Sequence, residues 1–252
     1  MVRIACTGMA AAFVWHAQGA DRTWSNTAGG AFEEPANWAG GLVPGTNDNA
    51  NFSANASYTV TFGSTVTNGN AKFVAPAGTV TLDIGAGNQY YMNNVSGTGT
   101  MRMENTAGGA PTVDLISGAI SVNSHVYLGD QATYHRNKLT VRNPGTLLQT
   151  RVWDVNVGLS GSHNELLVTN GATVAASRTV YAGYNTGSNN LITVTGTNTQ
   201  LIAATAIMAG RSGDNNRIVA ENFATVACTN GIFSIGELAG ADYNSITVRS
   251  GS

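Results

Sequence analysis

Six side chains suited to work on a carbohydrate lie in two short segments, one beginning at Arg151 and the other at Arg178. In enzymes that cleave sugars, carboxylates, Arg and Tyr act as acids and bases where they converge on one groove. Aromatic rings and guanidinium groups can also contact sugars without any reaction. The segments contribute Arg151, Trp153 and Asp154, then Arg178, Tyr181 and Tyr184.

These two segments can act together only if they lie side by side, and a repeat predicts that they do. A phrase that begins with Asn and alternates apolar with variable residues recurs at nearly constant spacing. A second phrase, apolar-x-apolar-Gly, recurs with the same period and is offset from the first by about half a period. The first phrase begins at Asn137, Asn164, Asn190, Asn216 and Asn244, and the second ends at Gly129, Gly158, Gly183, Gly210 and Gly236.

The repeat predicts an all-β fold: a right-handed parallel β-helix with coils of about 26 residues. Alternation within each phrase is typical of a strand with one face in a core. The segments are rich in Val, Ile and Thr and are interrupted by Gly or Asn, which disfavours helices. Right-handed crossovers are the general preference. Stacking should form two inward columns: Leu139, Leu166, Ile192, Ile218 and Ile246, then Val141, Val168, Val194, Ala220 and Val248.

The five Asn residues are predicted to form a ladder along one corner of the coils. Asn tolerates the left-handed backbone region, and its amide can hydrogen-bond to the coil above or below. The alternative is that Asn is simply a common turn residue. The Gly residues fit a corner that requires positive φ or close backbone approach. Both markers therefore predict structure rather than chemistry.

Metal and cofactor chemistry find little support in the sequence. His135 and His163 are about one repeat apart and should approach each other near the Asn corner. No carboxylate or Cys accompanies them, so we expect no metal site and no cofactor. Cys228 is expected to be a buried structural thiol rather than a nucleophile.

The composition of the chain argues against two classes of partner, nucleic acid and the membrane interior. The net charge is −2, only 10% of the residues are charged, and Lys and Arg are scattered, which disfavours nucleic acid. No apolar run reaches the roughly 18 residues required for a transmembrane helix.

The N-terminal part differs from the repeats. Residues 1 to 20 predict a secretory signal, because Arg3 precedes an apolar stretch and Ala17 to Gly19 match a small-x-small cleavage site. An ordinary N-terminal strand or helix is the alternative. Residues 21 to 52 are aromatic and irregular and are expected to cap the open edge of the solenoid. Residues 53 to 252 would form the coils, most regularly over residues 112 to 252.

The order of residues in the cap resembles a known family. It runs Trp24, Gly29-Gly30, Asn37-Trp38, Gly40-Gly41, Pro44-Gly45, Asp48, Ala50 and Phe52, followed by Gly- and Asn-rich repeats. This order is similar to the start of secreted bacterial β-helical proteins with autotransporter-associated β-strand repeats. The resemblance extends over nearly the whole chain after residue 20 and implies an exported or surface protein. It specifies fold and export better than activity, and the sequence lacks the sorting signal or translocation barrel of such proteins.

The last coil ends at Val248 with nothing predicted to cover it. We expect either a longer natural protein or a second chain at the edge formed by Ile246, Thr247 and Val248. Head-to-tail stacking at that edge would produce a filament.

These patterns predict a non-catalytic structural or adhesive solenoid, secreted or at a bacterial cell surface, with self-association and a cell-surface glycan as its expected partners. The alternative is a carbohydrate-active enzyme, lyase-like or glycosidase-like, or a carbohydrate-binding module that uses the face from Arg151 to Tyr184. Neither outward column beside the Gly marker concentrates carboxylates, which favours the non-catalytic interpretation.

Overall fold

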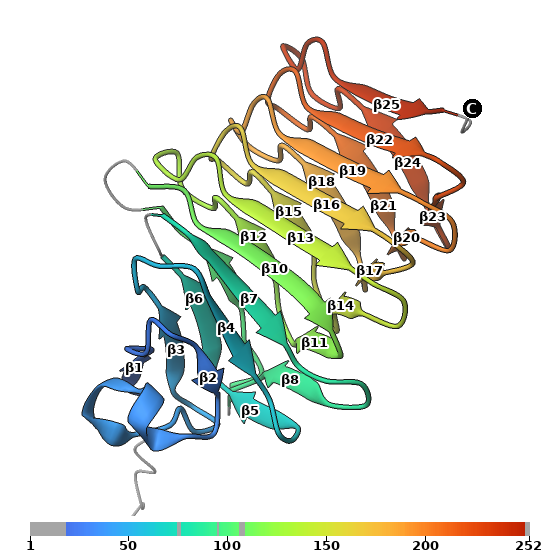
Figure 1. Ribbon diagram of the computed structural model, residues 1–252. Coiled ribbons are helices and arrows are strands. Elements are labelled where there is room, and N and C mark those ends of the chain that lie inside the picture. Colours follow the sequence, from blue (N-terminus) through green and yellow to red (C-terminus); the bar gives the residue numbers. More distant parts are fainter. Residues whose placement is uncertain (1–18, 75–76, 95, 106–108, 250–252) are drawn as a thin grey trace, which may run out of the picture.

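The computed structural model describes residues 19–74, 77–94, 96–105 and 109–249, which wind into a right-handed β-helix of three parallel sheets (Figure 1). The chain passes from the first sheet to the second and third, then returns to the first sheet one coil further along the axis. The predicted fold class is confirmed. The predicted secretory signal, residues 1 to 20, lies almost wholly outside the described residues, and Cys6 lies with it.

The strands of each sheet follow one another along the axis. The first sheet contains β1 (Asp21–Thr23), β3 (Asn49–Phe52), β6 (Asn70–Phe73), β9 (Met101–Met103), β12 (Val126–Leu128), β15 (Val155–Val157), β18 (Thr179–Ala182), β21 (Ala206–Ala209) and β24 (Ile232–Ile235). The second contains β2 (Gly30–Ala31), β4 (Tyr58–Thr61), β7 (Thr79–Asp83), β10 (Thr112–Ser117), β13 (Lys138–Arg142), β16 (Glu165–Thr169), β19 (Leu191–Thr195), β22 (Arg217–Glu221) and β25 (Ser245–Val248). The third contains β5 (Val66–Asn68), β8 (Gln89–Met92), β11 (Ala119–Val122), β14 (Leu147–Thr150), β17 (Thr173–Ala176), β20 (Gln200–Ala203) and β23 (Thr225–Cys228).

The inward columns of the second sheet match the predicted register. Leu139 pairs with Leu166, Leu166 with Ile192, and so on to Ile246. The column is fully buried from Leu139 to Ile218. Because each coil buries its apolar side chains only against its neighbours, the coils must stack to form the core.

The predicted Asn ladder is confirmed and is buried. From Asn164 to Asn244, each Asn side-chain oxygen accepts a hydrogen bond from the backbone N–H of the Asn one coil earlier. The side-chain oxygen of Asn137, at the start of the ladder, is buried without a hydrogen-bond partner among the described residues. The N–H of Asn164 donates to Asn190 at 2.9 Å, and that of Asn190 donates to Asn216 at 3.0 Å. The bonds from Asn137 to Asn164 and from Asn216 to Asn244 measure 3.0 and 2.8 Å. A corner donor that would otherwise be buried without a partner is thus satisfied by the following coil.

One detail of the ladder prediction is wrong. The left-handed conformation belongs to the residue before each ladder Asn, not to the Asn itself. These preceding residues are Arg136, His163, Asn189, Asn215 and Tyr243, with φ between 55° and 60°. The turn at the preceding residue allows the following Asn side chain to reach along the axis.

The two sequence markers meet in space. Gly129, Gly158, Gly183 and Gly210 all have φ between 71° and 79°. A Cβ at any of them would lie 2.1 to 2.6 Å from the side-chain nitrogen of the ladder Asn in the following coil. Gly is therefore required both by the backbone conformation and by the space that the Asn amide occupies.

The N-terminal end is closed by aromatic rings. Trp24, Phe32 and Trp38 are at most 2% exposed, and Trp24 and Trp38 meet edge to face at 5.2 Å. The short helices η1 (Pro35–Asn37) and η2 (Ala39–Gly41) lie in this end. Because β1 pairs with β3 and β2 with β4, the sheets begin inside the predicted cap rather than after residue 52.

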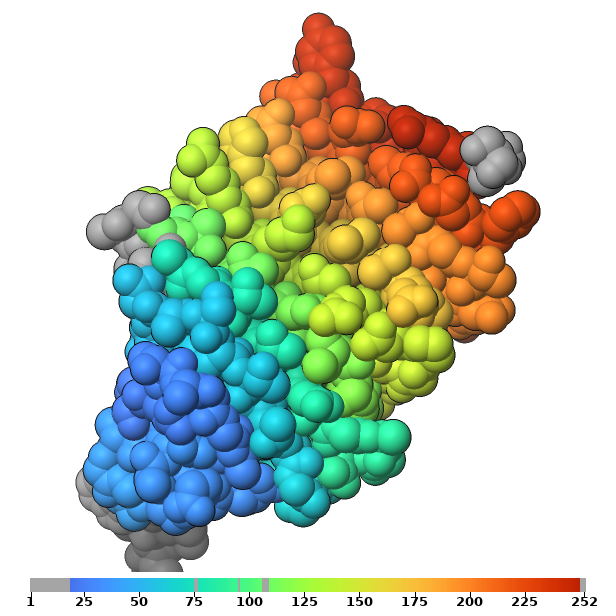
Figure 2. All heavy atoms as spheres, viewed as in Figure 1, coloured from blue at the N-terminus to red at the C-terminus, as the bar shows by residue number. Residues whose placement is uncertain are grey.

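The C-terminal end has an open apolar hollow of about 290 Å³. Its lining includes Phe233, Ile235 and Val248, which are 50%, 52% and 79% exposed. Figure 2 shows the contrast between the ends: the N-terminal residues form a rounded lobe, whereas the last coil projects as separate ridges. The predicted edge, Ile246 to Val248, pairs on one side only, with β22.

Two glycines allow two contributions to stability to be measured separately: the clash of a Cβ with the ladder Asn, and the strain of a left-handed backbone. Gly183 and Gly145 share a φ of 79°. A Cβ at Gly183 would lie 2.2 Å from the Asn216 amide and 2.5 Å from the Gly187 carbonyl oxygen, whereas a Cβ at Gly145 would meet nothing within 4 Å. We predict that Gly145→Ala lowers the free energy of unfolding by about 1 kcal/mol, through the left-handed backbone. Gly183→Ala should cost about 1–3 kcal/mol more, because the ladder must shift. Denaturant titration of both variants checks this, and equal losses would show that the Asn contact does not constrain the glycine.

Candidate functional site

Five of the six predicted site residues line one depression on the outer face of the first sheet. Its volume is about 280 Å³, and it spans β12, β15 and β18. The residues brought together are Trp153, Asp154, Arg178, Tyr181 and Tyr184. Arg151 lies in the turn after β14, is exposed, and does not line the depression. The register predicted from the repeat therefore brings the two segments together.

The side chains at the centre of the site form a continuous stack across the coils. The Arg102 guanidinium lies 4.9 Å from the centre of the Tyr127 ring, which stacks on His125 at 5.0 Å. His125 stacks on Trp153 at 5.4 Å, and the Arg178 guanidinium lies 4.6 Å from the centre of the Trp153 ring. Cation–π and ring–ring contacts of this kind stabilise each pair by about 0.5–1.5 kcal/mol.

This stack changes the expected mode of sugar contact. His125 belongs to the coil before Trp153 and Arg178 to the coil after it, so they approach the indole from opposite sides along the axis. Trp153 remains 40% exposed, but its ring faces are occupied. A sugar would therefore meet the exposed edge of this ring rather than its face. The stack therefore presents to solvent the edges of its rings and the N–H groups of its two guanidinium groups.

Asp154 is the carboxylate in this depression and is held by the protein itself. One carboxylate oxygen accepts a hydrogen bond from the backbone N–H of Thr179 at 2.9 Å. The other lies 3.7 Å from Nε2 of His125. Paired carboxylates, which glycoside hydrolysis requires, are absent from the residues that line it.

The tyrosines lie beside Asp154. Burial raises the pKa of Tyr181, nearby Asp154 and Tyr184 add to this, and a Thr179 hydrogen bond and Arg211 oppose it. A tyrosine that acts as a base must lose its proton near neutral pH, so a raised pKa acts against that role. Tyr184 meets Tyr181 edge to face at 4.6 Å and is covered by the Arg211 guanidinium at 4.7 Å.

The two histidines and the cysteine singled out in the sequence lie outside this depression. His135 and His163 line a separate cavity of about 620 Å³, where Nδ1 of His135 accepts a hydrogen bond from the Ser162 N–H. Within the described part of the chain, no group of three or more His, Cys, Asp or Glu could hold a metal ion. Cys228 is a free thiol but only partly buried, so the prediction of a buried thiol is wrong; it lies in the last, one-sided coil.

Sequence reasoning missed His125 and Arg102. His125 stands opposite Asp154 in the register of β12 and β15, and Arg102 stands opposite Tyr127. His125 could have been found from the residue that lies one repeat before Asp154 in the sequence. Arg102 lies where the strand spacing is less regular.

No family model, curated protein or solved structure matches this chain. The fold itself therefore defines the class: a β-solenoid protein with a stacked polar and aromatic face. None of the described helices has the length and apolar character needed to cross a membrane.

Tyr181 offers a direct check on the chemistry of this site. We predict that its phenol ionises above its ordinary pKa of about 10, because burial disfavours the charged phenolate. NMR of protein labelled with ¹³C at the tyrosine ζ carbon, with Tyr181→Phe to assign the signal, measures the midpoint. A midpoint below 10 would contradict the structure, and one near neutral pH would make Tyr181 a usable base.

Proposed function

We propose that this chain is a non-catalytic structural and adhesive β-solenoid of a bacterial cell exterior, which binds a cell-surface glycan along the outer face of its first sheet. The observation that carries the proposal is the row of stacked side chains from Arg102 to Arg178. The stack holds donors in fixed positions before any ligand arrives, which lowers the entropy lost on binding.

Secretion and surface location rest on the sequence: the predicted signal in residues 1 to 20 and the resemblance to exported β-helical repeat proteins. Two features of the site favour binding over the enzymatic alternative. Asp154 is the only carboxylate among the residues that line the depression, and the pKa of Tyr181 is shifted away from that of a base. A lyase or glycosidase would require a converging acid and base that this depression does not offer.

The test compares two exposed aromatic residues. Trp153→Ala removes the centre of the stack, whereas Tyr243→Ala removes a ring that is 84% exposed at a remote corner. We expect the chain to bind at least one polymer in a panel of neutral and acidic glycans, without releasing reducing ends. Trp153→Ala should weaken this binding about tenfold and Tyr243→Ala should not change it.

Failure to bind any glycan would overturn the proposal. Glycan cleavage that disappears in Tyr181→Phe would establish the enzymatic alternative instead.

A second proposed activity is self-association through the C-terminal end. The apolar hollow lined by Phe233, Ile235 and Val248 favours it. At the N-terminal end the rings of Trp24, Phe32 and Trp38 are buried, so a copy of the same hollow is the better complement. This favours a symmetric dimer over a head-to-tail filament.

Val248→Asp tests the dimer, with Asn185→Asp as an exposed control that follows β18, two coils before the last one. Sedimentation over a range of concentrations should show a dimer for the parent chain and the control. The Val248→Asp variant should remain a monomer, because a charge at an edge strand opposes pairing. A parent chain that stays monomeric at all concentrations would exclude self-association, and filaments would exclude the symmetric arrangement.

A further inference from the structure

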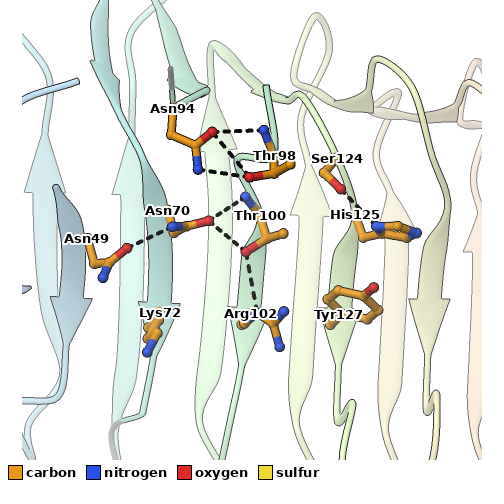
Figure 3. Close-up of a pocket in the computed structure, with 10 residues that line it drawn as sticks. All are labelled: Asn49, Asn70, Lys72, Asn94, Thr98, Thr100, Arg102, Ser124, His125 and Tyr127. Carbon is orange, nitrogen blue, oxygen red and sulfur yellow. Dashed lines mark hydrogen bonds between the residues drawn. The ribbon is translucent and has the colours of Figure 1, made fainter. Parts of the chain in front are cut away.

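The outer face of the first sheet holds a second depression that adjoins the first. Its volume is about 520 Å³, and it shares His125 and Tyr127 with the depression around Trp153. Figure 3 shows its floor, where Lys72, Arg102 and Tyr127 lie in one row on neighbouring strands. The two adjoining depressions extend along the solenoid axis from β3 to β18, and together they are called the groove below.

The cations of this groove have few internal partners. Arg102 forms an ion pair with Asp130. Within the described ranges, neither Lys72 nor Arg178 has a carboxylate within ion-pair distance. No Asp or Glu lines the second depression, and Asp154 is the only one in the first. Lys72 and Arg178 thus carry charges without an ion-pair partner on a chain whose net charge is −2, which points to a negatively charged ligand.

Arg178 is prepared for such a ligand. Its guanidinium lies over the Trp153 ring, which restricts the orientation of the group. A guanidinium in this position keeps its N–H edge free, and that edge matches the two oxygens of a carboxylate. Lys72 adds a single mobile charge at the other end of the groove.

A row of polar side chains beside Lys72 and Arg102 suits sugar hydroxyls. The amide of Asn70 donates to the Asn49 side-chain oxygen at 2.7 Å, and its own oxygen accepts from the backbone N–H and the hydroxyl of Thr100 at 2.9 Å. This row continues across adjacent strands (Figure 3). Since neighbouring strands lie about 4.8 Å apart, the groove repeats its polar groups at a regular interval. A chain-like ligand with regularly spaced groups would match that interval.

We propose that the groove binds an acidic polysaccharide whose sugar units carry carboxylates and whose chain runs along the solenoid axis. Its carboxylates contact Lys72 and Arg178, and its hydroxyls contact the Asn and Thr side chains that line the second depression. The proposal rests on the function proposed above, in which this face binds a glycan, and names the chemical class of that glycan.

The experiment uses polygalacturonate and hyaluronate as probes, each beside its methyl-esterified, uncharged form. Affinity for the full chain is measured by isothermal titration calorimetry. We expect the acidic polymers to bind about tenfold more tightly or better than their esters, the gain typical of a charge-assisted hydrogen bond. Lys72→Ala and Arg178→Ala should each weaken binding of the acidic polymers three- to tenfold. Arg217→Ala, an exposed cation on the second sheet, should leave it unchanged.

Three other outcomes would overturn the proposal of an acidic polysaccharide. Equal binding of acids and esters, unaffected by Lys72→Ala, would overturn the acidic-ligand proposal and leave the glycan-binding function standing. If no polymer binds, both fail. Single-stranded DNA that binds as tightly as the polysaccharides would overturn the proposal by showing that the groove recognises any linear anion. Circular dichroism of each variant confirms that the fold is retained.

Discussion

The buried hydrogen bonds between successive Asn side chains are the constraint on which the regular part of the solenoid depends. From Asn164 onward, each amide oxygen satisfies a backbone donor of the previous coil, and the ladder residues from Asn137 to Asn216 are at most 1% exposed. The ladder bonds join residues 26 to 28 positions apart, so the loops absorb small differences in coil length. An insertion of one residue within a strand, by contrast, would turn the side chains beyond it to the wrong face. The ladder therefore confines the period of the coils to a narrow range in this part of the chain. The glycines at the facing corner exist because the amides occupy the space where their side chains would be.

A fixed period has a consequence on the outside. When every coil begins at the same point, outward side chains fall into columns, and neighbours on adjacent coils meet at contact distance. The stack from Arg102 to Arg178 is such a column set, built from residues on four coils. A loosely registered solenoid could carry the same residues without bringing them together. The proposed binding face is thus a result of the same interior hydrogen bonds that order the core.

The regular coils could be predicted from the sequence, and the irregular ones could not. Strands β13, β16, β19, β22 and β25, the Asn ladder and the meeting of Trp153 with Arg178 all follow from one offset. The left-handed conformation of the residue before each Asn could not be predicted in this way. The repeated phrase begins at the Asn, and residues as different as Arg136 and Tyr243 precede it. The groove around Lys72 was also missed. There the hydrogen-bonded residues Asn49, Asn70 and Thr100 are separated by 21 and 30 positions, so no constant offset aligns them. The covered faces of Trp153 depend on side-chain rotamers, which a repeat does not specify.

The most direct test of the central claim is the stability of Asn190→Ala beside Asn185→Ala. Asn190 accepts hydrogen bonds from the backbone and side chain of Asn164, whereas Asn185 is exposed and makes one long bond to Ser160. Removing the Asn190 oxygen leaves two buried donors without a partner, each of which costs about 1–3 kcal/mol. Denaturant unfolding should therefore show a loss of roughly 2–6 kcal/mol for Asn190→Ala and almost none for Asn185→Ala. Equal stability of the two variants would contradict the claim that the ladder holds the coils in register.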